Sequence, residues 1–258
     1  MFGGPAAVYD RFVGRYSPHL ARAMCDAASV RPGQRALDVG CGSGALVAEL
    51  ATRLGPECVA GIDPSESFAE AARLRVPGAR ILVGAAELLP FGDGEFDATL
   101  SQLVVNFLSD PEGGVREMAR VTRPGGVVAG CVWDYGGEMT MLRTYWDAAG
   151  ALDPGGTAEL RETHTMRFAT PETLADLWRS AGLGEVQVEP LVVEATYEHF
   201  DDLWSPFPTG VGPAGAYAAS LDPEAQRELR DEFARRLGNP EGSFTLSARA
   251  WCAVGLSQ

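Results

Sequence analysis

The chain has 258 residues, 46% of them hydrophobic, and its 35 acidic and 21 basic residues give a net charge of −14. This composition supports a sizeable core, and no apolar run reaches the roughly 20 residues of a membrane span. The negative charge repels phosphate backbones, which argues against nucleic acid as a partner. Residues 1–10 show no basic segment followed by an apolar one, so we expect a cytoplasmic protein without a secretory signal.

Two residue types narrow the chemistry further. Every basic residue is arginine, so a mechanism that needs lysine is excluded. The cysteines are odd in number, widely spaced and include no C-x-x-C pair, so we expect free thiols and no metal site. They are Cys25, Cys41, Cys58, Cys131 and Cys252.

Short apolar segments alternate with helical patterns in the first half of the chain. We expect one or two helices within residues 5–30, broken near Ser17–Pro18, and further helices and strands up to Trp133. The strands are expected at 35–40, 58–62, 80–84, 96–101 and 126–133, and the helices at 43–54, 65–75 and 110–121. This alternation predicts an α/β fold, a parallel sheet with helices on both faces.

The regular alternation of strand and helix patterns ends after Trp133. We expect helices at 139–150 and 170–181, a strand at 185–197 and a final strand at 243–254. The segment between these two strands is too long for a hairpin, and it contains proline-broken helices and a charged helix at 223–237. We interpret residues 199–240 as an inserted helical lid, because loops of that size are usually functional or disordered.

A glycine-rich junction is the strongest motif. The segment 36–44 reads A-L-D-V-G-C-G-S-G, a strand that ends in alternating glycines before a helix begins. Glycine allows a sharp turn and a close ligand approach, and the helix N-terminus offers N–H groups to a polar ligand. Asp63 follows at the end of the next strand, where a carboxylate accepts hydrogen bonds from both ribose hydroxyls of a nucleoside.

This fingerprint fits two classes of cofactor. The NAD pattern G-x-G-x-x-G/A is satisfied by Gly40, Gly42 and Ala45. The pattern D/E-x-G-x-G-x-G of S-adenosylmethionine enzymes is satisfied in full by Asp38, Gly40, Gly42 and Gly44.

Downstream motifs favour the second interpretation. They are G-A-A-E-L-L-P-F at 84–91, G-E-F-D at 94–97 and R-V-T-R-P-G-G at 120–126. Together with the glycine motif they resemble the class I methyltransferases that use S-adenosylmethionine, of the UbiE-like "methyltransferase 11" type. The resemblance covers residues 35–134 closely and Tyr9–Ser17 less specifically, and it includes no motif in the C-terminal 125 residues.

The resemblance implies a fold and a domain layout. It implies a Rossmann-like, doubly wound, mostly parallel seven-stranded sheet with one antiparallel strand, in a single domain of residues 1–258. The expected parts are an N-terminal helical cover (1–34), a cofactor-binding core (35–134), later helices and a strand (135–198), the lid (199–240) and the final strand (241–258).

The resemblance also implies the cofactor-binding residues. Asp38 and the loop Gly40, Cys41, Gly42 and Gly44 would hold the methionine end of S-adenosylmethionine. Asp63 and the adjoining Pro64 would meet the ribose. The adenine would lie against Ala85, the backbone N–H of Ala86 and the neighbourhood of Glu87, and Ser101 and Gln102 would flank the methyl group. One position departs from the family, since Ala85 stands where an aspartate often accepts the adenine amino group.

The sequence assigns no catalytic base. Methyl transfer from a sulfonium needs a base only where the acceptor must lose a proton. The candidates are His164, His199 and Tyr16, for each of which an ordinary structural role is the alternative. Aromatic residues after Trp133 are candidates for an apolar acceptor pocket.

We therefore expect a methyltransferase for a small organic molecule, with secondary metabolism as one setting, no membrane partner and no prediction of oligomeric state. Two alternatives stay open. Ala85 favours a cofactor-binding partner subunit that does not catalyse. An NAD-dependent reductase would need a catalytic set other than Tyr-x-x-x-Lys, since lysine is absent.

Overall fold

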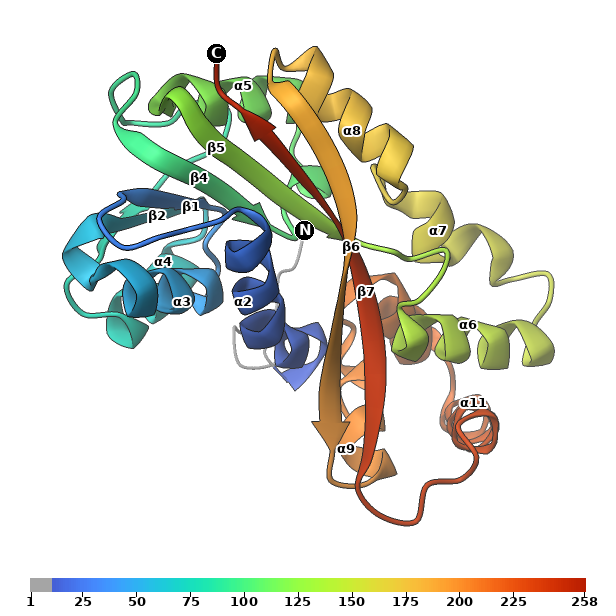
Figure 1. Cartoon of the computed structure of the whole chain (residues 1–258). Helices are drawn as coiled ribbons and strands as arrows, with labels where there is room; N and C mark the ends of the chain where they lie inside the picture. The colour runs from blue at the N-terminus through green and yellow to red at the C-terminus, as the bar shows by residue number, and fades with distance from the viewer. Residues whose placement is uncertain (1–10) are drawn as a thin grey trace. The chain divides into compact units, whose positions relative to one another are not determined.

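The computed structural model describes residues 11–258, which contain a seven-stranded sheet in the order β3-β2-β1-β4-β5-β7-β6 (Figure 1). The first five strands pair in parallel, and β7 pairs antiparallel with β5. The sheet confirms the predicted fold class. Its strands are β1 (Ala36–Val39), β2 (Val59–Asp63), β3 (Arg80–Val83), β4 (Phe96–Gln102), β5 (Thr122–Trp133), β6 (Gly184–Tyr197) and β7 (Phe244–Leu256).

Helices cover both faces of the parallel strands. One layer contains α2, which packs on α3, and α4 beside it, while α5 packs with α8 on the opposite face (Figure 1). The helix predicted at 43–54 is present as α3, and it buries one apolar face made of Leu46, Val47, Leu50 and Leu54. These helices are α2 (Ser17–Ala27), α3 (Ala45–Leu54), α4 (Glu66–Arg75), α5 (Pro111–Val121) and α8 (Pro171–Ser180).

The internal contacts divide the chain into two compact units. The sheet unit contains Ser17–Trp133, Arg167–Leu191 and Ala250–Gln258. The other, which we call the aromatic unit, contains the described residues up to Tyr16, together with Asp134–Met166 and Val192–Arg249. Strands β6 and β7 each contribute residues to both units, and every predicted cofactor-binding residue belongs to the sheet unit.

Aromatic side chains form the core of the aromatic unit. The ring of Tyr145 stacks on Phe207 with centroids 4.4 Å apart and meets Phe233 edge-on at 5.7 Å. The Tyr145 hydroxyl donates to the carbonyl of Ala214 over 2.9 Å. Residues 199–240 are therefore part of this core. The helices of the unit are α6 (Thr140–Leu152), α7 (Glu162–Thr165), α9 (Phe200–Trp204), α10 (Gly212–Ser220) and α11 (Pro223–Arg236).

Short 3₁₀ helices complete the described structure. They are η1 (Val13–Tyr16), η2 (Pro56–Cys58), η3 (Val105–Phe107), η4 (Ala158–Leu160) and η5 (Phe207–Thr209). The predicted helical break near Ser17–Pro18 is confirmed, because η1 ends at Tyr16 and α2 begins at Ser17. Proline is favoured in the first helical turn, where its missing N–H costs no hydrogen bond. The predicted helical residues 5–10 lie outside the described residues.

Candidate functional site

Three glycines turn the chain between β1 and α3. Gly40, Gly42 and Gly44 have φ angles of +75°, +50° and +87°, in the left-handed region that favours glycine. The N–H groups of Gly40 and Cys41 donate to the carbonyl of Ile62 at 2.8 and 2.9 Å, which ties the loop to β2. The predicted strand–glycine–helix junction is therefore present.

The three glycines differ in what lies beside them. A Cβ atom at Gly40 would overlap the side chain of Val104, and one at Gly44 would come within 3.1 Å of Ala72 in α4. A Cβ atom at Gly42 would meet nothing within 4 Å. Gly40 and Gly44 are thus needed for packing, whereas Gly42 leaves space beside the loop.

Asp38 is a buried carboxylate without a hydrogen-bond partner. It lies in β1 with 1% of its surface exposed, and neither oxygen reaches a partner in hydrogen-bond geometry among the described residues. Burial raises the pKa of this carboxyl well above its usual value, and nearby Asp63 adds to the rise. The backbone N–H of Val47 is near enough to oppose this rise in pKa but does not form a hydrogen bond of normal geometry with either oxygen. A buried carboxylate without a partner is energetically costly, and a cationic or N–H donor of a ligand would remove this cost.

Asp63 closes the other side of the glycine loop. Its Oδ2 accepts from the N–H of Gly42 at 2.9 Å, and its Oδ1 accepts from the N–H of Ser65 at 2.9 Å. Burial raises the pKa of Asp63, while these two N–H bonds lower it. Each carboxylate oxygen has two lone-pair directions, so both still have one for a hydroxyl group. Pro64 follows with an exposed ring.

Ser101 and Gln102 lie at the end of β4, next to β1. The Ser101 hydroxyl donates to the carbonyl of Val39 at 2.9 Å and is fully buried. The Gln102 side chain donates from Nε2 to the carbonyl of Ser17 at 3.1 Å, and its buried Oε1 has no hydrogen-bond partner. Asp38 and Gln102 therefore supply unsatisfied acceptors on the two neighbouring strands β1 and β4.

The loop after β3 brings Ala85, Ala86 and Glu87 to the same edge of the sheet. Ala85 is exposed and Ala86 is buried. Glu87 Oε1 accepts from the hydroxyl of Ser109 at 2.8 Å and from its N–H at 3.1 Å. Burial raises the pKa of Glu87, but the hydrogen bonds from Ser109 and Asp110 outweigh it and lower the pKa overall. The Glu87 side chain thus fixes the loop to the start of α5.

The candidate catalytic residues have structural neighbours. The His199 Nδ1 atom accepts from the N–H of Asp202 at 3.1 Å and caps α9, and His164 is an exposed residue of α7. Tyr16 is fully buried and accepts a hydrogen bond from the hydroxyl of Tyr197 at 3.3 Å. Burial is the main cause that raises the pKa of Tyr16. Their catalytic roles stay predictions.

The residues around the loop fit a nucleoside with a cationic side chain. The edge of the sheet between β1 and β4 is the point where neighbouring connections run in opposite directions, and ligands of doubly wound sheets bind there. Asp38 suits an ammonium group, Asp63 suits two hydroxyls, and Gly42 leaves space for a close approach. No group of three or more metal-ligating side chains is found within residues 11–258.

Comparisons with known proteins identify the family of this chain. A family model described as a methyltransferase domain matches residues 37–130. An uncharacterized methyltransferase of Mycobacterium bovis is 30% identical over 188 residues, 68% of this chain and 74% of that protein. The chain belongs to the class I S-adenosylmethionine-dependent methyltransferases. This membership sets aside the interpretation as an NAD-dependent reductase.

Two further relatives are similar to this chain in sequence, and one solved structure is similar to it in fold. A demethylmenaquinone methyltransferase of Mycobacterium bovis is 36% identical over 135 residues, 51% of this chain and 56% of that protein. The chain thus spans about half the length of this relative, and the share falls to 31% for a transposon-encoded protein of Streptomyces fradiae. A phosphoethanolamine N-methyltransferase of Haemonchus contortus, solved with S-adenosylmethionine, has the same fold at 16% identity, with a TM-score of 0.57, over 93% of this chain and 52% of that one.

Sequence patterns do not predict the role of two side chains in this methyltransferase. The side chains of Glu117 and Arg120 hold the loop that follows β3. Arg120 stands in the R-V-T-R-P-G-G motif, which identified the family but gave this arginine no role.

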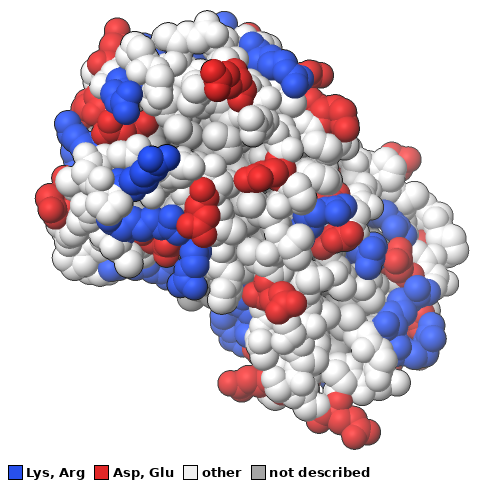
Figure 2. Space-filling view, in the orientation of Figure 1, with Lys and Arg blue, Asp and Glu red and all other residues white. Residues whose placement is uncertain are grey.

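Two further features of the methyltransferase are its surface charge and the apolar character of its helices. Acidic and arginine side chains lie interspersed on the face shown in Figure 2. Of the helices within residues 11–258, none combines the length and the apolar character that a membrane crossing requires.

Proposed function

We propose that this methyltransferase transfers a methyl group to a small organic acceptor from S-adenosylmethionine held at the carboxyl ends of β1, β2 and β4. The observation that carries the site is Asp38, whose two buried oxygens lack partners beside a glycine loop with open space at Gly42. The proposed contacts are those that the sequence motifs imply.

Each side chain has a separate task in this proposal. Asp38 and the Oε1 atom of Gln102 accept from the ammonium of the methionine end. Asp63 accepts from the ribose hydroxyls and positions Gly42 through its hydrogen bond of 2.9 Å. The backbone N–H of Ala86 donates to the adenine, and Ala85 contributes only backbone and a methyl group.

In-line displacement is the chemistry that the bound cofactor supplies, since its sulfonium methyl group moves to the acceptor atom as the carbon–sulfur bond breaks. The protein's residues hold the two reactants in line and exclude water from them. Where the acceptor must lose a proton, the proposed candidates for the base that takes this proton are Tyr16, His164 and His199. The position of the bound acceptor decides which of them is close enough.

Two observations support a small acceptor. The net charge of −14 opposes binding to a polyanionic nucleic acid. A relative is named as a demethylmenaquinone methyltransferase, and a quinone is an organic molecule and not a macromolecule. The alternative of a partner subunit without catalysis rests on Ala85 and needs a test of turnover.

The cofactor site is tested with Gly42→Ala. The added methyl group enters the open space beside the loop, so we expect at least about a tenfold loss of affinity for S-adenosylhomocysteine in calorimetry. Gly182→Ala is the matched control, since Gly182 also has a positive φ, +89°, with nothing within 4 Å of its added Cβ. Both changes strain the backbone, but only the first stands at the proposed site.

The outcomes separate the competing functions. Equal affinities of the two variants would contradict the site. Release of S-adenosylhomocysteine with any member of an acceptor panel would establish turnover. Binding of S-adenosylhomocysteine without turnover on the whole panel would favour the partner subunit.

A further inference from the structure

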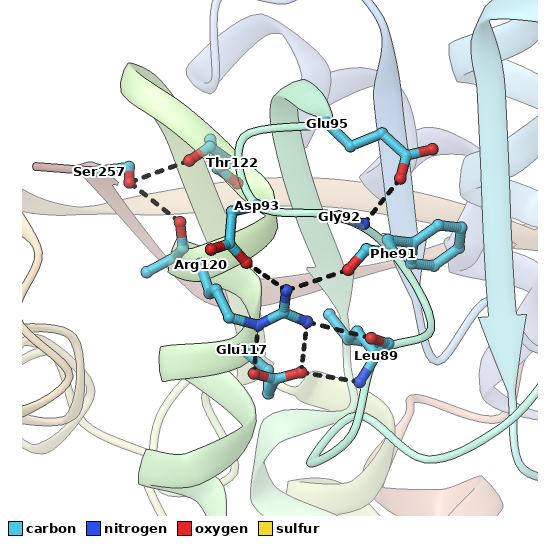
Figure 3. Close-up of polar contacts among 10 residues, drawn as sticks. Leu89, Phe91, Gly92, Asp93, Glu95, Glu117, Arg120, Thr122 and Ser257 are labelled. Carbon is cyan, nitrogen blue, oxygen red and sulfur yellow. Dashed lines mark hydrogen bonds and ion pairs between the residues drawn. The ribbon is translucent and has the colours of Figure 1, made fainter.

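The loop of residues 84–95, which joins β3 to β4, is held by α5 at two points. We call it the β3–β4 loop. It contains Ala85, Ala86 and Glu87, the residues that the proposed function places against the adenine. The contacts of this loop with α5 are drawn in part in Figure 3.

Arg120 makes the first attachment from the last turn of α5. Its Nη2 donates to the carbonyl of Leu89 at 3.0 Å and its Nη1 to the carbonyl of Phe91 at 3.0 Å (Figure 3). The same guanidinium donates to Asp93 at 2.7 Å. One rigid, planar group therefore fixes three successive parts of the loop.

Glu117 completes this attachment. Its two oxygens accept from Nε and Nη2 of Arg120 at 2.6 and 2.8 Å, a bidentate pair (Figure 3). Glu117 Oε2 also accepts from the N–H of Leu89 at 2.9 Å. The Arg120 hydrogen bonds lower the pKa of Glu117, so the acceptor stays ionised at neutral pH. Leu89 thus has both its N–H and its carbonyl bound by this pair.

The end of α5 that carries the pair is itself anchored. The Thr122 hydroxyl donates to the carbonyl of Met118 at 2.7 Å and shares a bond of 2.6 Å with Thr99 in β4. The Ser257 hydroxyl donates to the carbonyl of Ala119 at 3.0 Å (Figure 3). Carbonyls in the last turn of α5 thus accept hydrogen bonds from Thr122 of β5 and from Ser257 in the C-terminal segment. These bonds fix the end of the helix that carries Arg120.

Glu87 makes the second attachment at the other end of α5. Its carboxylate accepts from Ser109, as described above, and from the N–H of Asp110 at 3.4 Å. Ala86 lies directly before this residue and Leu89 two positions after it. The segment proposed to meet the adenine is therefore held on its C-terminal side by α5 and by Ser109 and Asp110, which precede that helix. Further along the loop, Phe91 also packs against Phe96 and Arg80.

Surface stabilisation alone does not account for this arrangement. An exposed ion pair contributes about 0–1 kcal/mol and needs no backbone partner. Here two of the arginine bonds go to neutral carbonyls, and the carboxylate binds a backbone N–H. The pattern determines the position of a loop backbone in addition to pairing charges.

We propose that Glu117 and Arg120 are positioning residues that set the base selectivity of the cofactor site, an inference that rests on the proposed function. They act through the β3–β4 loop by holding the backbone N–H of Ala86 where it meets the base. Adenine presents an acceptor at N1, whereas hypoxanthine carries a hydrogen there and presents a donor. A fixed N–H donor accepts the first base and rejects the second.

The experiment measures this selectivity directly. The affinities of S-adenosylhomocysteine and S-inosylhomocysteine are determined by calorimetry for the full chain, and their ratio is compared among variants. Arg120→Met keeps the length of the side chain and removes all its donors. Arg120→Lys keeps the charge beside Glu117 but not the planar set of donors, and it serves as well if Arg120→Met does not fold.

Arg116→Met is the matched control. Arg116 lies one turn earlier on α5, has 56% of its side chain exposed, and pairs with Glu112 at 3.3 Å. We expect the preference for adenine to fall at least about fivefold in both Arg120 variants, as one lost hydrogen bond predicts, and to stay unchanged in Arg116→Met.

The ratio distinguishes positioning from a structural role, because a smaller folded fraction weakens both ligands equally. An unchanged ratio in the Arg120 variants, or a parent protein that binds both nucleosides equally, would overturn the inference and leave the cofactor site intact. A parent that binds neither nucleoside would overturn the proposed function, and the inference with it.

Discussion

Asp38 costs the protein stability in a way that its proposed role explains. A buried carboxylate without a hydrogen-bond partner disfavours the folded state once it is ionised. Its raised pKa means that the folded protein holds this proton more tightly than the unfolded chain does. The free energy of unfolding therefore falls as pH rises from the ordinary carboxyl pKa toward the raised one.

Asp38→Asn tests this cost, because asparagine has the same shape and does not ionise. We expect the unfolding temperature of the variant to exceed that of the parent at pH 8, and the gap to close as pH falls to about 4. The variant should also lose affinity for S-adenosylhomocysteine. Asp176→Asn, at an exposed carboxylate of α8, is the control. A constant gap across the pH range would contradict the ionisation of Asp38 as its cause.

Residues of the site differ in how far the sequence predicts them. Gly40, Gly42 and Asp63 belong to a local pattern, and the structure places them together around one loop. That the Asp38 oxygens lack hydrogen-bond partners among residues 11–258 depends on the residues packed around them, so a local sequence pattern does not predict it. The role of Arg120 depends on a carbonyl 31 positions earlier in the chain, so its motif revealed the family but not the contact.

At the scale of elements, one helix meets the sheet through a tryptophan and two glycines. The Trp178 indole of α8 is fully buried and donates to the carbonyl of Val128 in β5 at 3.0 Å. An added Cβ at Gly130 would overlap the six-membered ring of this indole, and one at Gly255 would lie 3.2 Å from Cδ1 in its five-membered ring. The two strands therefore leave a slot for this side chain.

Gly130→Ala should destabilise the protein by about 1–3 kcal/mol, because the indole has to move out of its slot. Phenylalanine lacks the ring atoms that the added methyl group would meet. We expect Gly130→Ala to cost clearly less when Trp178→Phe is already present, a coupling that urea unfolding measures. Equal costs in the two backgrounds would show that the slot does not limit packing.

Apolar periodicity in the sequence predicts where strands and helices lie. The exact ends of a strand depend on its pairing with the neighbouring strand, which the sequence does not show. Strand β5 begins at Thr122 and not at the predicted Gly126, because Thr122 pairs with Phe96 before the register shifts to Ala98 with Val127. A Pro-Gly-Gly sequence normally predicts a turn, and only the neighbouring strand reveals the extension. The four-residue helix α7 lacks the length that a periodic pattern needs.

At the scale of the molecule, the sequence and the contacts partition the chain in different ways. The sequence describes one domain with an inserted lid at residues 199–240. In the structure these residues share a core with Tyr145 of α6, within a unit that also contains Asp134–Met166. Contacts between segments far apart in sequence define this unit, and no linker marks its limits. The single-domain layout stays a prediction.

The proposed lid role is best tested inside that core. Deleting residues 199–240 would expose the rings of α6, so a single substitution is the cleaner change. Phe207 is fully buried and contacts Tyr145, Phe233 and Phe12 with ring centroids 4.4, 5.6 and 4.8 Å apart. Phe207→Ala should cost about 3–5 kcal/mol and loosen η5 and the helices around it.

If residues 199–240 cover the acceptor as the predicted lid, Phe207→Ala should reduce acceptor methylation at least about tenfold, since a loosened lid would admit water and misplace the acceptor. Affinity for S-adenosylhomocysteine should stay near that of the parent, because every proposed cofactor residue lies in the sheet unit. Leu152→Ala, at a half-exposed position of α6, is the control in the same unit. Undiminished turnover would show that residues 199–240 do not shape the acceptor site. A matching loss of cofactor affinity in the folded variant would instead assign the segment to the cofactor site.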